Sequence, residues 1–97
     1  MVETTLISSY VGGARFEELE PKGRYRIISE WGGRRRVIPV EIGDNYVKIG
    51  DKVYKGNTLE EALKKAVDGV YEENPGGLEV LVMGSIAERV LEGREEN

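Results

Sequence analysis

The chain has 97 residues, of which 39% are hydrophobic and 33% charged, and its formal net charge is −4. It contains neither cysteine nor histidine, which excludes disulfides, thiolate catalysis and the commonest general base and transition-metal ligand. The length indicates one domain over residues 1–97. No apolar run approaches the ~18 residues of a membrane span, and the N-terminus lacks a signal-peptide pattern, so we expect a cytoplasmic protein. The high content of Glu, Lys and Arg is also typical of thermophile proteins.

Two elements are predicted ahead of the main sheet. Residues 4–11 read as a first strand. Residues 14–20 predict a short helix that presents Phe16 and Leu19 and stops before Pro21.

Residues 24–55 carry the clearest pattern, in which tight-turn signals separate four β-segments. The segments lie at about 24–31, 34–42, 45–49 and 52–55, and the turns are Gly32-Gly33, Gly43-Asp44 and Gly50-Asp51. Two-residue turns fix the register of a hairpin. They pair Ile27 with Ile38, Val40 with Val47, and Val47 with Tyr54. All three turns predict the same apolar core face, made of Tyr25, Ile27, Ile38, Val40, Ile42, Val47, Ile49 and Tyr54.

The opposite face of this predicted sheet is mostly polar and contains a proline. It carries Arg24, Arg26, Ile28, Glu30, Arg35, Val37, Pro39, Glu41, Tyr46, Lys48, Val53 and Lys55. Because proline cannot donate to the hydrogen-bond ladder, we expect a bulge or an irregular stretch at Pro39.

The second half of the chain predicts a helix, a strand and a second helix. The capping box Thr58–Glu61 opens an amphipathic helix over about 58–73, which we expect to pack on the apolar sheet face. Residues 78–83 form an apolar run that predicts a strand, and Ser85–Glu88 is a capping box that opens a short C-terminal helix. Residues 94–97 are expected to be a frayed tail. The predicted class is therefore α+β, with a mainly antiparallel sheet containing a β-meander. The positions of the strands at 4–11 and 78–83 in that sheet stay open.

Basic and aromatic residues on the polar face suggest a nucleic-acid site. Cations neutralise phosphates, and an exposed aromatic ring can stack on a base. In the competing interpretation these charges only solvate the face, because Arg24 lies opposite Glu41 and Arg35 opposite Glu30. The candidate nucleic-acid-binding residues are Arg26, Arg34, Arg36, Tyr46, Lys48 and Lys55.

The same face also holds apolar residues that a solvated sheet surface tends to lack. They are Ile28, Val37 and Val53, with Tyr46 among them. They predict cover by another element, such as residues 14–20, or by a second subunit in a homodimer.

Gly84 and Ser85 form a candidate anion site at the start of the C-terminal helix, where unpaired N–H groups can bind phosphate. The segment Gly84 to Leu91, Gly-Ser-Ile-Ala-Glu-Arg-Val-Leu, resembles the Gly-Ser-Val-Ala-Glu-Arg-Val-Leu segment of universal stress proteins, in whose ATP-binding members the Gly-Ser helps hold phosphates. Tyr71 and Asn74 stand where that family's pattern has glycines, and its parallel sheet differs from the hairpins predicted here. A capped amphipathic helix is the competing interpretation.

Clustered glutamates complete the list of candidate chemistry. Paired carboxylates can bind Mg²⁺ or act as acid and base, but runs of this kind on helices are typical of solvated faces. We therefore predict no catalytic residue, no metal and no cofactor. The leading hypothesis is a non-enzymatic interaction module that acts as a homo-oligomer or binds a protein partner, without a membrane role. The alternative is RNA binding through the basic sheet face.

Overall fold

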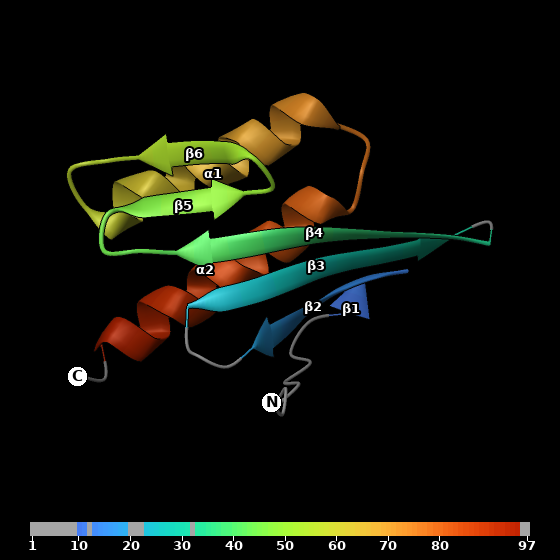
Figure 1. Ribbon diagram of the computed structural model, residues 1–97, viewed down its shortest axis with the longest axis horizontal. Helices are drawn as coiled ribbons and strands as arrows, with labels where there is room; N and C mark the ends of the chain where they lie inside the picture. The colour runs from blue at the N-terminus through green and yellow to red at the C-terminus, as the bar shows by residue number, and fades with distance from the viewer. Residues whose placement is uncertain (1–9, 12, 20–22, 32, 96–97) are drawn as a thin grey trace.

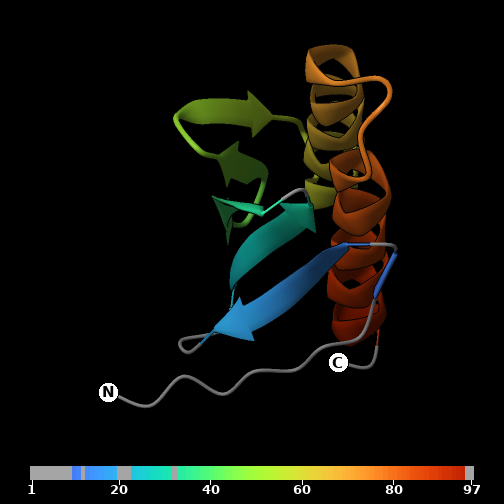
Figure 2. The ribbon, with the colours of Figure 1, turned by 90° about the vertical axis from the view of Figure 1, so that its right-hand side faces the viewer.

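One antiparallel sheet and two helices make up the part of the chain that the computed structural model describes, residues 10–11, 13–19, 23–31 and 33–95. The six strands pair in sequence order. Both helices lie on the same face of the sheet (Figures 1 and 2), with α1 over β5 and β6 and α2 over β2 and β3. The elements are β1 (Tyr10–Val11), β2 (Ala14–Leu19), β3 (Arg24–Trp31), β4 (Arg34–Ile42), β5 (Tyr46–Ile49), β6 (Lys52–Lys55), α1 (Leu59–Glu73) and α2 (Glu79–Glu95).

The three predicted hairpins form, and two of them have the predicted register. Ile27 pairs with Ile38 across the first, and Val47 with Tyr54 across the third. The turn residues Gly33 and Gly50 have φ of 75° and 62°, the left-handed region that glycine adopts at no steric cost.

The second hairpin is shifted by two residues from the prediction. Val40 pairs with Ile49 rather than Val47, and the Gly43 N–H donates to the carbonyl of Tyr46 at 2.9 Å, which makes a longer loop. Since side chains alternate sides with a period of two, a shift of two residues leaves every side chain on its predicted face. The predicted core face is confirmed, because all eight of its residues belong to the buried cluster or pack against it.

Residues 14–19 form a strand, so the helix predicted at 14–20 is wrong. β2 pairs with β3 over its whole length. Ala14 and Phe16 are buried, while Arg15 and Glu17 between and beyond them are partly exposed, which is the period of a strand. The spacing of three between Phe16 and Leu19 also fits a helix, but pairing with the edge of β3 makes this segment a strand. Of the strand predicted at 4–11, only Tyr10–Val11 lies within the described residues, as β1.

Pro39 causes no bulge in the β3–β4 ladder, contrary to expectation. Arg26 pairs with Pro39 within a continuous register. The Pro39 carbonyl accepts from the Gly50 N–H at 2.9 Å, so the backbone polar groups of Pro39 point toward the β5–β6 turn. The β4–β5 register begins at Val40, so the N–H that Pro39 lacks interrupts no hydrogen bond of that ladder.

The helix predicted at 58–73 is confirmed as α1. Thr58 is its N-cap, and its hydroxyl oxygen accepts from the Glu61 N–H at 3.2 Å. The Glu61 carboxylate accepts from the Asn57 N–H at 2.8 Å. Its side chain thus turns back to the helix start, one residue before the Thr58 N–H that the reciprocal bond of a capping box uses. The buried stripe is Leu59, Ala62, Leu63, Ala66 and Val70.

The strand predicted at 78–83 is wrong, because α2 begins at Glu79 and absorbs it. Val82, Met83 and Ile86 are fully buried, whereas Leu81 is 54% exposed, which is helical spacing. A continuous apolar run does not distinguish a buried strand from a buried helix. α2 also continues to Glu95, so the expected tail at 94–97 begins inside the helix, and residues 96–97 lie outside the described part.

Two helical glycines should respond oppositely to alanine. A Cβ on Gly69 of α1 would overlap the ring of Tyr54, whereas a Cβ on Gly84 of α2 would meet nothing within 4 Å. Alanine favours a helix over glycine by about 1 kcal/mol. We expect Gly84→Ala to raise the free energy of unfolding by about that amount and Gly69→Ala to lower it, as measured by urea denaturation. Equal gains in both variants would contradict the packing of Tyr54 on α1.

Tyr25 should make stability depend on alkaline pH. Its hydroxyl donates to Glu18 at 3.4 Å, and Arg89 of α2 donates to the same carboxylate at 2.7 Å. Burial, followed by the negative charge of Glu18, raises the pKa of Tyr25 to about 12. The folded state therefore keeps a proton that the unfolded chain loses near pH ~10, and stability falls as pH rises from there toward the folded pKa. Urea unfolding at about pH 9 and about pH 11.5 should show a smaller loss in Tyr25→Phe than in the wild type. Identical losses would contradict this assignment.

Candidate functional site

The face of the sheet opposite the helices, here called the outer face, has the composition that the sequence predicts. No helix or strand of the described residues covers it (Figure 2). Val37 and Val53 are 44% and 49% exposed on it. Its exposed charged residues are Arg24, Glu30, Arg35, Glu41, Lys48 and Lys55.

The four residues predicted to form an interface do not make one continuous apolar patch. Ile28 is fully buried. It lies between two ion pairs on its own face, Arg15–Glu30 at 2.9 Å and Arg26–Glu17 at 2.6 Å, so the stems of long side chains border it.

Val37 and Val53 lie apart on the outer face. Val53 pairs with Lys48, and Lys48 pairs with Glu41 on β4. Val37 is four residues from Glu41 along β4, which is about 13 Å of strand. The surface is therefore two apolar spots separated by charged side chains.

Three residues of the predicted nucleic-acid set come together on β5 and β6, beside Val53. Tyr46 pairs with Lys55 across β5 and β6, and Lys48 is two residues along β5 from Tyr46. The Tyr46 hydroxyl donates to the Glu41 carboxylate at 2.6 Å, and this hydrogen bond raises the pKa of Tyr46. The cluster thus contains two lysines, one carboxylate and one aromatic ring, whose hydroxyl is hydrogen-bonded to that carboxylate.

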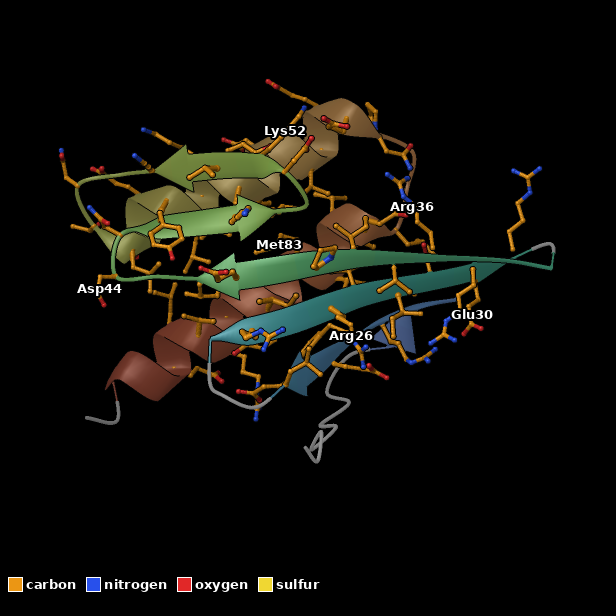
Figure 3. The ribbon with its side chains drawn as sticks, in the orientation of Figure 1. Arg26, Glu30, Arg36, Asp44, Lys52 and Met83 are labelled. Carbon is orange, nitrogen blue, oxygen red and sulfur yellow. The ribbon has the colours of Figure 1, made fainter. Side chains whose placement is uncertain are left out.

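The other three predicted residues lie elsewhere. Arg26 donates to Glu17 at 2.6 Å. Arg36 follows the alternation of Ile38 on the helix side of β4 and lines a cavity there with Lys52 and Glu73. Arg36 and Lys52 are labelled in Figure 3. Arg34 shares that alternation at the β3–β4 hairpin. Arg34 and Arg36 therefore do not extend the outer-face cluster.

Gly84 and Ser85, the candidate anion site, lie inside α2 and not at its start. The helix begins at Glu79, and the Ser85 hydroxyl donates to the Leu81 carbonyl at 3.3 Å. Backbone N–H groups beyond the first turn of a helix are bonded within it. The free backbone N–H groups on which the anion-site prediction depended are therefore not found at Gly84 and Ser85.

A buried carboxylate that the sequence did not predict lies between the sheet and α2. Glu79 is 4% exposed. Its Oε2 accepts from the Ser29 hydroxyl at 3.0 Å, and its Oε1 accepts from the Asn74 amide at 3.4 Å. Two cavities, of about 350 and about 220 Å³, are both lined in part by Asn74 and Glu79.

The sequence feature that indicates burial of Glu79 is its spacing from the apolar residues that follow it. Glu79 precedes Val82 by three positions and Met83 by four, so a helix there places its side chain on the buried stripe. Because 78–83 was interpreted as a strand, Glu79 seemed a polar interruption of an apolar run.

Comparison of the chain with protein-family models, curated proteins and solved structures found no match. The resemblance of residues 84–91 to universal stress proteins thus has no further support, and the observed sheet is antiparallel throughout. Within the described residues, no helix is long and apolar enough to cross a bilayer. The same part of the chain contains no group of three or more His, Cys, Asp or Glu side chains placed to hold a metal ion.

Proposed function

We propose that the protein is a non-enzymatic interaction module that forms a homodimer through the outer face of its sheet. The supporting observation is the one-sided packing of the fold. Both helices lie on the opposite face, and Val37 and Val53 on the outer face remain 44% and 49% exposed. Burial of such residues against a second copy would stabilise a dimer by about 25 cal/mol per Å² of apolar surface removed from water.

The charge pattern of the outer face favours a second copy as the partner. Glu41 on β4 lies between Arg24 on β3 and Lys48 on β5. A two-fold symmetric interface requires a surface that complements itself. An axis close to this row would bring Glu41 of each copy near Lys48 of the other, beside Val53.

The sheet edge at β6 is less suited to association than the face. β6 has only four residues, with Lys52 and Lys55 at its ends. The carbonyl of Lys55 already accepts from the Lys65 ammonium at 2.9 Å. Short, lysine-flanked edge strands resist strand-to-strand pairing between chains.

Charge reversal tests the proposed dimer directly. In sedimentation velocity at micromolar concentration, we expect the wild type to be dimeric and Glu41→Lys and Lys48→Glu to be monomeric. The double variant should recover the dimer, because the reversed pair is again complementary. Lys64→Glu on the exposed side of α1 is the control and should remain dimeric, as should Tyr46→Phe, which removes only the hydroxyl bonded to Glu41.

A wild type that stays monomeric at hundreds of micromolar would refute the dimer. RNA binding, supported by the Tyr46, Lys48 and Lys55 cluster, is the other outcome to distinguish. In anisotropy titrations with labelled single-stranded RNA at about 50 and about 200 mM salt, it would appear as salt-sensitive affinity. Lys48→Glu would weaken that affinity and Glu41→Lys would strengthen it, whereas the proposed dimer is lost in both variants.

A further inference from the structure

The larger cavity beside Glu79 has the size and position of a small-molecule site. Its volume of about 350 Å³ lies at the lower end of ligand pockets, which span ~300–1,000 Å³. Strand β3 and the α1–α2 connection form its walls. Its lining includes Ser29, Glu30, Asn74, Gly76, Gly77 and Glu79, and contains no lysine or arginine among the residues that the structure describes.

No ion pair to Glu79 forms among the residues that the structure describes, although Arg36 and Lys52 line the neighbouring cavity that Glu79 also borders. Glu79 is 4% exposed. Its two hydrogen bonds come from neutral donors, and the one from Asn74, at 3.4 Å, is long beside the usual ~2.9–3.0 Å. Burial of a carboxylate costs free energy. The two hydrogen bonds and the place of Glu79 in the first turn of α2 offset part of that cost, and a positive charge from a ligand would offset more.

The α1–α2 connection approaches this carboxylate closely. A Cβ on Gly77 would overlap the Asn74 amide and Oε1 of Glu79. A Cβ on neighbouring Gly76 would meet nothing within 4 Å. Gly77, which lines the cavity together with Glu79, thus allows the connection to approach the weakly bonded Oε1.

We propose that this cavity binds a small organic ammonium ion, with Glu79 as its counter-ion. An ammonium group brings one positive charge and up to three donors, which match Oε1 of Glu79 and the side-chain carbonyl of Asn74. Ser29 holds the other carboxylate oxygen in place. A divalent metal suits the cavity less well, because such ions take six or more oxygen ligands and the carboxylate of Glu30 is paired with Arg15 at 2.9 Å.

Titration of the ¹⁵N-labelled full chain with ethylammonium and with putrescine, followed by amide chemical shifts, tests this site. We expect saturable shifts at Ser29 and at residues 76–80. Matched additions of 1-propanol and sodium acetate should leave these signals in place. The absence of saturable shifts with both amines at tens of millimolar would overturn the proposal.

The isosteric variant Glu79→Gln separates the charge from the shape of the site. It should fold at least as stably as the wild type, since an amide buries no charge, and should bind the amines at least about tenfold more weakly, a loss of ~1.4 kcal/mol. Glu88→Gln, an exposed position on α2, is the control and should bind like the wild type. Equal amine affinity in Glu79→Gln would refute the counter-ion role. If circular dichroism shows that Glu79→Gln is unfolded, Gly77→Ala tests the site instead, because its methyl group would overlap Oε1 of Glu79 and the Asn74 amide. Amine affinity equal to that of the wild type in Gly77→Ala would then overturn the proposal. Since the site lies away from the outer face, the titration is also valid in monomeric Lys48→Glu.

Discussion

Phe16→Ala should lower the free energy of unfolding by about 3–5 kcal/mol, the usual cost of removing a buried aromatic ring. The Phe16 side chain is 1% exposed and meets Tyr25 edge to face, with ring centroids 5.9 Å apart. Small domains have only about 5–15 kcal/mol of total stability, so the variant should unfold at much lower urea concentration than the wild type. This result is expected only if β2 is a strand that directs Phe16 into the core.

Val37→Ala is the matched control for Phe16→Ala. Val37 is also on a strand but is 44% exposed on the outer face, and its truncation should change stability by about 0.5 kcal/mol or less. A loss below about 1 kcal/mol in Phe16→Ala would contradict the burial described here.

Met83→Ala and Leu81→Ala should differ strongly, because α2 places these residues on different sides. Met83 is fully buried and Leu81 is 54% exposed. We expect a loss of about 2–5 kcal/mol for Met83→Ala and about 0.5 kcal/mol or less for Leu81→Ala, by urea denaturation. In a strand the two residues would share one face, so similar losses would contradict the helix.

The sequence allowed the β3–β6 hairpins and the core face to be predicted because turn chemistry and alternation agree there. Glycine at positions 33 and 50 provides the positive φ that those turns need. The two-residue error at Val40 arose because alternation alone cannot distinguish register shifts of two. At 14–20 and 78–83 the local patterns were ambiguous, and tertiary contacts determine the secondary structure. Residues 14–19 pair with the edge of β3, and Met83 packs against the sheet as part of a helix.

Prediction of the candidate site was limited by the same two errors. The alternation identified the outer face, but the partners of Arg26 and Glu30 come from β2, which was not predicted as a strand. Glu17 and Arg15 therefore seemed unrelated to that face, and the burial of Ile28 between the two ion pairs was missed. Prediction of the buried Glu79 carboxylate would have required knowledge of where α2 begins. It would also have required the position on β3 of its partner Ser29, which lies 50 residues away in the sequence.

The proposed dimer is tested most directly by isotope-filtered NOE spectroscopy on a mixture of ¹³C-labelled and unlabelled chains. We expect contacts between copies at the methyl groups of Val53 and none at Leu81 on the helical side. Contacts between copies at Leu81 and none at Val53 would contradict it, as would the absence of any such contact at millimolar concentration.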